Sequence, residues 1–276
     1  MPAFLLSLRE GLEAALIVGI VLGALGRLGK RNQARFVWLG VGAAFAASLL
    51  VAVGLDMVGA EFEGVAAQVF EGVTMLLAAG VLTWMIFWMQ REGSEIHQRL
   101  TADVKAVAEE GARSGASLFL LAFLAVFREG IELALFLVAA TFATSGLQTI
   151  SGASGGLLLA AGLGYLMFAG SVRLNLKLFF RVTSLLLIVF AAGMLAYGVH
   201  ELVEAAVLPA LVEPVYNISP ILSDQAGLGL LLKALFGYNS NPALLETMAY
   251  VAYFVVVWAA LRMHKTLKPA GVSSSS

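Results

Sequence analysis

The chain has 276 residues, of which 60% are hydrophobic and only 13% are charged, and its formal net charge is −1. Soluble domains are about 45–50% apolar and about 25% charged, so this composition excludes an ordinary soluble enzyme or a disordered chain and predicts an integral membrane protein. The balanced charge offers no basic footprint for nucleic acid. No cysteine is present, which excludes disulfides, thiolate metal sites and cysteine nucleophiles.

Seven stretches are long and apolar enough to cross a bilayer as helices, which takes roughly 20 residues each. In chain order they are residues 3–26, 36–58, 67–89, 116–142, 152–172, 182–202 and 243–263. Their length favours helices over the shorter alternating strands of an outer-membrane barrel. The sequence therefore predicts an all-α integral membrane protein with seven transmembrane helices.

Two connections between the expected spans are long. Residues 90–115 are polar with near-helical charge spacing, which indicates a solvated cytoplasmic helix. Residues 203–242 contain prolines followed by the apolar run 227–236, which is too short to span a bilayer. We expect that run to form a short surface or interfacial helix on the external side.

Most basic residues lie in connections that would share one side of the membrane. Four lie in 27–35, four in 91–113, three in 173–181 and three in 262–268, which accounts for 14 of the 17 Lys and Arg residues. Because cytoplasmic loops carry the excess of Lys and Arg, we expect the N-terminus outside and the C-terminus in the cytoplasm. The opposite side holds only Lys233 and is acidic, which either attracts cations or is simply tolerated there.

Two of the expected spans carry charges where a bilayer disfavours them. Arg9-Glu10-Gly11-Leu12-Glu13 lies in the first span, and Arg128-Glu129-Gly130-Ile131-Glu132 lies 119 residues later in the fourth. Both pentapeptides fall near the middle of their spans and hence near the bilayer midplane. Each ionised side chain there costs roughly 2.5–3.5 kcal/mol, so six would cost on the order of 15–20 kcal/mol before pairing and hydration. Two copies at one depth are difficult to explain by packing alone.

The spacing within each pentapeptide is suited to binding a cation. Its two glutamates are three residues apart and share a helix face, and its arginine can pair with the glutamate four residues later. Its glycine, Gly11 or Gly130, lets another helix approach closely. Antiparallel association of the two helices would bring four carboxylates and two arginines together, with a formal charge of −2.

We expect this cluster to be a metal site. The expected ligands are Glu10, Glu13, Glu129 and Glu132, and the supporting ion pairs come from Arg9 and Arg128. Carboxylates are hard ligands that suit iron, manganese, calcium or magnesium. The alternative is a buried Arg–Glu network that only fixes helix register, but it would leave two negative charges uncompensated near the midplane.

The two halves of the chain are similar beyond these motifs. The third and sixth spans share a Val-Thr pair followed by Ala-Ala-Gly, within 73–80 and 182–193. With three spans per unit the second copy must be inverted, which predicts a 3+3 inverted-topology repeat plus a seventh helix, with a substrate site near the midplane. The expected parts are 1–115, the first three-helix repeat with its cytoplasmic linker; 116–202, the inverted repeat; 203–242, an external loop with short helices; and 243–276, the seventh helix and cytoplasmic tail.

Further polar residues lie at the outer ends of the third and sixth spans. They are Glu71, His200, Glu201 and Glu204. These residues either line an entry path to the midplane site or are interfacial charges, which are common and cheap at helix ends. Trp84 and Trp88, near the cytoplasmic end of the third span, fit an aromatic belt.

The chain resembles a known family over essentially its whole length. The resemblance lies in the two Arg-Glu-Gly-x-Glu motifs and, for bacterial members, in Leu232–Asn239, Pro242, Glu246, Tyr250 and Tyr253. This is the high-affinity iron permease family, also called oxidase-dependent iron transporters. The resemblance implies seven helices, an external N-terminus and iron translocation. It assigns the ligand roles to Glu10, Glu13, Glu129 and Glu132, with Arg9 and Arg128 as their partners.

The resemblance also implies partners and a location. Family members work with an iron oxidase or peroxidase, and bacterial members often with a periplasmic iron-binding protein. The short external loops lack the long acidic extension of fungal members, which favours a bacterial-type, multi-pass protein of the cell inner membrane. Iron would be its substrate, no permanently bound cofactor is expected, and a homo-oligomer is compatible with the sequence.

We therefore expect an iron permease, not an enzyme, that moves Fe³⁺, Fe²⁺ or both into the cell through the paired glutamates. A transporter of another hard divalent cation such as Mn²⁺ is an alternative. So are a membrane-embedded di-metal carboxylate enzyme and a receptor or assembly scaffold. The enzyme would favour a Glu-x-x-His pattern, which neither motif has, and neither the enzyme nor the scaffold explains an inverted repeat as well.

Overall fold

The computed structural model describes residues 2–92, 101–106, 114–170, 175–209, 211–212, 214–223 and 227–266. Regular structure within these residues is helical throughout, which confirms the all-α architecture. The elements are α1 (Pro2–Arg27), the 3-10 turn η1 (Arg31–Gln33), α2 (Ala34–Ala60), α3 (Val65–Glu92), α5 (Ser114–Ala143), α6 (Gly146–Phe168), α7 (Leu176–Glu204), α8 (Gly227–Phe236) and α9 (Leu244–Thr266). Residues 101–106 are helical as well.

Each expected span overlaps one long helix, but two helices begin earlier than expected. The Ser145 side chain accepts a hydrogen bond from the backbone of Gln148, so α6 begins at Gly146 rather than 152. Asn175 does the same for Leu178, so α7 begins at Leu176 rather than 182. These polar caps supply acceptors to free backbone N–H groups, and a search for apolar runs does not detect them.

The remaining expectations concern the connections. The apolar run 227–236 forms the short helix α8, as expected. Of the expected cytoplasmic linker helix, residues 101–106 are helical, and residues 93–100 and 107–113 lie outside the described residues. The expected cytoplasmic tail beyond residue 266 also lies outside them.

Within the described residues, five helical stretches are long and apolar enough to cross a membrane. They are Arg31–Gly59, Val65–Trp88, Gly146–Phe168, Leu176–Glu204 and Leu244–Met263. Helices α1 and α5, with 26 and 30 residues, are also long enough to span a bilayer, but each carries a charged pentapeptide. Large apolar side chains such as Leu50, Leu158 and Val256 are exposed on the outer faces of the helices. The protein is therefore built to lie in lipid, which solvates such side chains.

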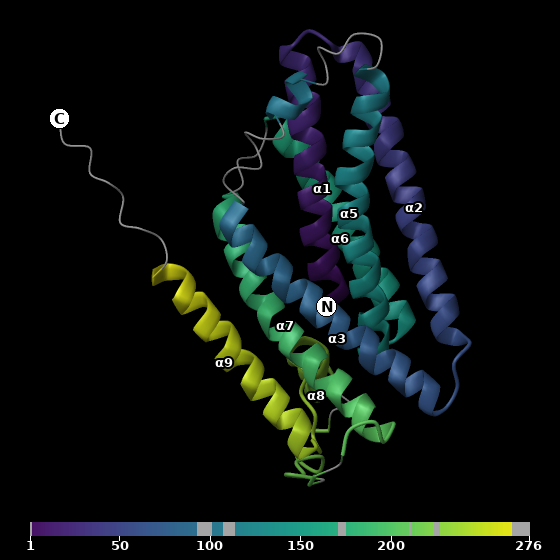
Figure 1. Ribbon diagram of the computed structural model, residues 1–276, viewed down its shortest axis with the longest axis vertical. Coiled ribbons are helices and arrows are strands. Elements are labelled where there is room, and N and C mark those ends of the chain that lie inside the picture. Colours follow the sequence, from purple (N-terminus) through teal and green to yellow (C-terminus); the bar gives the residue numbers. More distant parts are fainter. Residues whose placement is uncertain are drawn as a thin grey trace, which may run out of the picture.

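The helices form two groups, which Figure 1 shows in the upper right and the lower left. In the first group α1 packs along α6, α2 packs along α5, and α1 also contacts α5. In the second group α3 packs along α7, which also contacts α8 and α9. The pairings are symmetric: if α1 is exchanged with α5, α2 with α6 and α3 with α7, the pair α1–α6 becomes α5–α2, and the pairs α3–α7 and α1–α5 are unchanged. An inverted repeat of three helices would have this pattern.

Two clusters of buried apolar side chains organise the packing. The first, the shared core, joins all four central helices through Leu6 of α1, Met75 of α3, Phe136 of α5, Leu187 of α7 and their neighbours. The second, the bundle core, joins α1, α2, α5 and residues 101–106, and its members are Val21, Ala24, Leu25, Val37, Val104, Leu118 and Ala122. The two helix groups are thus held together mainly by the shared core.

Both motif glycines lie where a neighbouring helix approaches closely, as expected. A Cβ atom at Gly11 would lie 2.8 Å from the Ala160 side chain of α6, and one at Gly130 would overlap Ser48 of α2. Gly40 allows a similar approach of α2 to α5, because a Cβ atom there would lie 2.5 Å from the carbonyl oxygen of Phe119. Backbone atoms cannot move aside as a side chain can, so Gly40 cannot be enlarged without separating the helices.

We therefore predict that Gly40→Ala lowers the free energy of unfolding by about 1–3 kcal/mol, the usual cost of overpacking. Gly42→Ala is the matched control on the same helix, since a Cβ atom at Gly42 has no neighbour within 4 Å. Thermal unfolding of the purified protein in detergent measures both changes. Equal melting temperatures for the two variants would contradict the close contact between α2 and α5.

Candidate metal site

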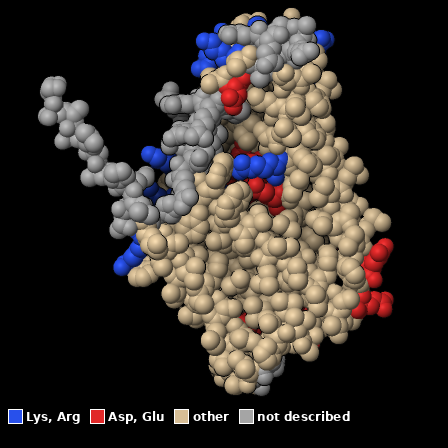
Figure 2. Space-filling view, viewed as in Figure 1, with Lys and Arg blue, Asp and Glu red and all other residues tan. Residues whose placement is uncertain are grey.

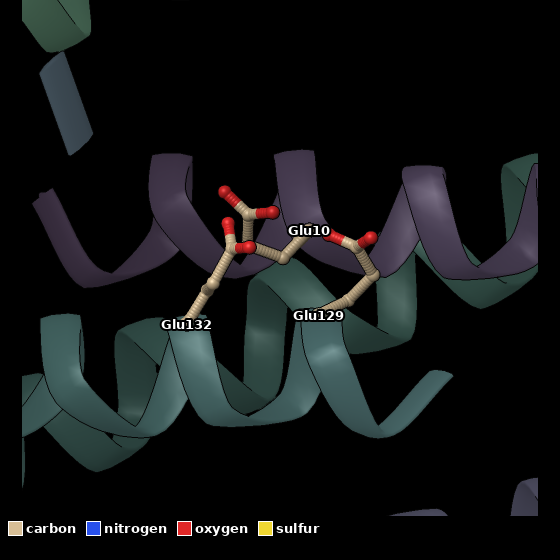
Figure 3. A group of neighbouring side chains, drawn as sticks. All are labelled: Glu10, Glu129 and Glu132. Carbon is tan, nitrogen blue, oxygen red and sulfur yellow. The ribbon is translucent and has the colours of Figure 1, made fainter. Parts of the chain in front are cut away.

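Three of the four predicted glutamate ligands come together where α1 and α5 pass each other. Figure 3 shows Glu10 of α1 directed toward Glu129 and Glu132 of α5. Each offers one carboxylate oxygen, and these oxygens lie within 4.8 Å of one another. The three residues are only 1%, 5% and 7% exposed. The crossing of α1 and α5 thus buries a cluster of carboxylates.

The fourth predicted ligand, Glu13, does not belong to this group of three. It is buried next to the cluster and interacts electrostatically with Glu132. Its carboxylate oxygen Oε1 lies 3.2 Å from Nε of Arg9, four residues earlier on the same helix. This local ion pair holds the Glu13 side chain along α1.

Each arginine pairs with the glutamate four residues later, as the spacing predicts, and also with the adjacent glutamate of its motif. Arg9 lies 3.5 Å from Glu10 and 3.2 Å from Glu13. Arg128 lies 3.6 Å from Glu129 and 3.2 Å from Glu132. The pairs four residues apart follow from helix geometry within each copy, and all four pairs reduce the net charge that must be buried.

Both arginines also contact α3, which the sequence analysis did not anticipate. Nη1 of Arg9 lies 3.6 Å from the Met85 sulfur, and the guanidinium carbon of Arg128 lies 4.2 Å from the centre of the Trp88 ring. A guanidinium over an indole ring is a favourable cation–π contact. The aromatic-belt interpretation remains appropriate for Trp84, which is 58% exposed, but Trp88 belongs to the charged site.

The cluster has more negative charge and more unpaired oxygens than its own residues can satisfy. Oε2 of Glu10, Glu129 and Glu132 is buried without a hydrogen-bond partner among the described residues. An unsatisfied buried carboxylate is costly, and four glutamates outnumber two arginines. Bound cations or protons must compensate this excess of negative charge. Hard metal cations are the ions that such a cluster of carboxylate oxygens binds best.

The predicted entry-path residues gather at the far ends of α3 and α7. His200 lies 3.3 Å from Glu204 and 3.4 Å from Glu246, and Gln68 donates a hydrogen bond of 3.2 Å to Glu204. Asn239 donates hydrogen bonds of 3.1 Å to both oxygens of Glu246. We call these five residues the outer polar chain.

The other two entry-path residues lie beside this chain. Glu201 is buried and interacts electrostatically with Glu71 and Lys233. From the sequence, Glu246 is only one of the acids that could attract cations to this side and Lys233 is its lone basic residue, and neither they nor Gln68 and Asn239 are predicted to belong to the entry path. The acidic first turn of the last span at Glu246 was the available signal.

The shared core separates the two polar regions. Glu71 and Met85 are 14 residues apart on α3, which is about 21 Å along a helix, and Met75, Ala78 and Leu82 lie between them in the shared core. A cavity of about 250 Å³ borders Glu246 and Asn239. A larger one of about 500 Å³ lies among α3, α7 and α9 and is lined mainly by apolar side chains together with Thr83 and Tyr253.

Comparisons with known proteins agree with this arrangement. The family model described as the iron permease FTR1 family matches residues 1–267. The ferrous iron permeases EfeU of Escherichia coli O157:H7 and Shigella sonnei are each 34% identical over 252 residues, which is 91% of this chain and 91% of the relative. EfeU of Yersinia pestis is 32% identical over 91% of this chain and 89% of the relative. No solved structure is significantly similar to the chain.

The unequal burial of the two arginines leads to a stability prediction. Arg9 is 0% exposed and Arg128 is 39% exposed. Arg9→Met should therefore lower the free energy of unfolding by about 3–5 kcal/mol, because it leaves buried carboxylates without their counter-charge. Arg128→Met should lower it by only about 1 kcal/mol, because its ion pairs are partly exposed to solvent. Thermal unfolding in detergent measures the difference.

A second substitution tests whether the loss comes from stranded charge. Adding Glu13→Gln to Arg9→Met should recover part of the lost stability, since one stranded carboxylate is removed. The assignment of Arg9 as the buried counter-charge is wrong if the double variant has a lower melting temperature than Arg9→Met alone. It is also wrong if Arg9→Met and Arg128→Met lose the same amount of stability.

Proposed function

The chain belongs to the iron permease FTR1 family, and we propose that it imports iron ions across the cell inner membrane through the carboxylate cluster between α1 and α5. The observation that carries the proposal is the convergence of Glu10, Glu129 and Glu132 within 4.8 Å. Such a cluster near the middle of lipid-embedded helices is expensive unless a cation uses it. Arg9 and Arg128 limit its charge, so that binding stays weak enough for release.

The proposal includes seven membrane crossings, namely α1, α2, α3, α5, α6, α7 and α9. The concentration of basic residues in alternate connections supports an external N-terminus. The exchangeable pairing of α1 with α6 and α2 with α5 supports the 3+3 inverted repeat. In such transporters the substrate site lies near the midplane where the repeats meet, and the carboxylate cluster occupies that position here.

The outer polar chain and its neighbours Glu71 and Glu201 form the proposed entry. An iron ion arriving from outside first meets Glu204, which is about half exposed. It then loses water stepwise as carboxylate oxygens replace its hydration shell. The outer carboxylates raise the local cation concentration, which increases the rate of capture. Glu13, one turn along α1 from Glu10, gives the ion a further carboxylate on its way inward.

The choice of ion and of partners is also part of the proposal. The relatives are named ferrous iron permeases, which favours Fe²⁺ over Fe³⁺, although an all-oxygen site would also accept Mn²⁺. A periplasmic iron-binding protein and an iron oxidase or peroxidase are the proposed partners on the outer side. The candidate cluster of the described residues contains glutamates and no histidine, which argues against a di-iron enzyme of the Glu-x-x-His type.

Iron uptake into proteoliposomes tests the proposed site. Glu10→Gln, Glu129→Gln and Glu132→Gln each keep the side-chain shape and remove one charged ligand. Each should reduce uptake of radioactive iron at least ~10-fold, since even changes behind a metal ligand cost 10–100-fold in affinity. Glu63→Gln, in the exposed turn between α2 and α3, is the control and should transport normally. Normal uptake by all three cluster variants would exclude the site.

The entry path makes a different kinetic prediction. The double variant Glu201→Gln with Glu204→Gln should raise the KM for iron several-fold, because capture weakens, and leave the maximal rate nearly unchanged. The effect should shrink at high salt, which screens attraction at the mouth. Glu61→Gln, which neutralises an exposed acidic residue on the same side, is the control and should leave the KM unchanged. A lower maximal rate at saturating iron, with KM unchanged, would contradict a role in entry.

A further inference from the structure

The two arginines of the site differ in burial although their motifs are equivalent. The Arg9 side chain is fully enclosed, whereas 39% of the Arg128 side chain is exposed. At this depth an exposed guanidinium must face a water-filled opening, since contact with lipid is too costly. Figure 2 shows basic and acidic side chains next to each other in the middle of a face with little other charge around them.

The two arginines also lie on opposite sides of the carboxylates. Arg9 precedes Glu10 on α1, which in the proposed orientation runs from outside to inside. Arg128 precedes Glu129 on α5, which runs the other way. The contacts with α3, which runs from outside to inside in the proposed orientation, give the same order: Arg9 contacts Met85, and Arg128 contacts Trp88 nearly one turn further inward, so Arg9 lies on the outer side and Arg128 on the inner side. The exposed arginine is the one that faces the cytoplasm.

Packing between the two helix groups follows the same division. The residues of α1 and α5 that belong to the shared core, including Leu6, Phe136 and Ala140, lie on the outer side of the carboxylates. The inner halves of α1 and α5 pack through Val21 and Leu118 in the bundle core, which contains no described residue of α3 or α7. Among the described residues, the two groups are thus packed together on the outer side of the cluster and not on its inner side.

We propose that this structure is the inward-open state of an alternating-access cycle, with Arg9 against Met85 as the closed outer gate and Arg128 on Trp88 as the open inner gate. The inference rests on the iron-permease function and the orientation proposed above. In the outward-open state the two repeats exchange conformations, so that Arg9 becomes exposed and Arg128 becomes enclosed. The ion enters past Arg9, binds the carboxylates and leaves past Arg128.

Single cysteines test which side of the cluster is open, because the native chain has no cysteine. Ser7 and Val126 precede Glu10 and Glu129 by three residues, so they occupy equivalent positions one turn away on the same helix face. Ser7 is 0% exposed and Val126 is half-buried. Ser7→Cys and Val126→Cys leave every charge of the site in place.

A membrane-impermeant maleimide is added to right-side-out and inside-out membrane vesicles that contain each variant. Val126→Cys should react from the cytoplasmic face, ~10-fold faster than Ser7→Cys reacts from either face, as a dominant inward-open population requires. Trp88→Cys should react from the cytoplasmic face as well. Trp84→Cys is the control for lipid exposure and should react more slowly than Trp88→Cys, because Trp84 lies one turn farther from Arg128 along the apolar groove that both rings line.

The opposite labelling pattern overturns the proposal. Faster reaction of Ser7→Cys from the outer face would mean that the site opens outward. Failure of both Val126→Cys and Trp88→Cys to react, with normal melting temperatures, would mean that no aqueous opening reaches Arg128.

Transport kinetics test Trp88 as a positioning residue for Arg128. Trp88→Ala removes the ring on which Arg128 rests in the inward-open state, so this state loses a stabilising contact and the maximal iron uptake rate should fall on the order of tenfold. The KM for external iron should stay the same, and Trp88→Phe should restore most of the rate. Trp84→Ala should behave as wild type. A change in KM alone, or no rescue by Phe, would exclude the gate role.

The two experiments separate failure of the gate from failure of the proposed function. Cysteine labelling needs neither iron nor flux. If labelling is as expected but no iron is transported, the inward-open assignment stands and the iron-transport proposal is wrong. If iron is transported but Ser7→Cys reacts from the outside, the iron-transport proposal stands and the inward-open assignment is wrong.

Discussion

Six charged side chains between two lipid-embedded helices, five of them buried, are the constraint on which the rest of this structure depends. Their cost in a bilayer is tolerable only because each arginine pairs with the glutamates of its own helix turn. Those pairs leave an excess of negative charge, with buried oxygens of Glu10, Glu129 and Glu132 that lack a hydrogen-bond partner among the described residues. The features that make these helices difficult to insert thus also make them a cation site.

The close packing of the four-helix group has the same origin. Carboxylates on α1 and α5 converge only if the two helices approach closely, and Gly11 and Gly130 leave room for α6 and α2 behind them. Helix α3 then completes the site from the second group, because Met85 and Trp88 contact one arginine each. Since α3 also carries Glu71 at its other end, one helix connects the proposed entry with the proposed gates.

The sequence predicted the parts of this structure that depend on local geometry. Ion pairs within a pentapeptide follow from helical spacing, and the glycine contacts follow from the need for close helix approach. It did not predict contacts that depend on how a helix is rotated and tilted. Trp88 reaches Arg128 because of the rotation of α3, and Glu13 lies outside the group of three although its ion pair with Arg9 matches that of Glu132 with Arg128. The early starts of α6 and α7 depend on single capping side chains, Ser145 and Asn175.

Anomalous X-ray scattering at the iron edge, from crystals of the protein soaked in ferrous iron under anaerobic conditions, tests the central claim most directly. The account predicts one strong peak among the carboxylates of Glu10, Glu129 and Glu132, within bonding distance of at least two of them. It also predicts that this peak is lost in the Glu129→Gln variant. Iron found only at the outer ends of α3 and α7, with none between α1 and α5, would contradict the claim that these glutamates carry the transported ion.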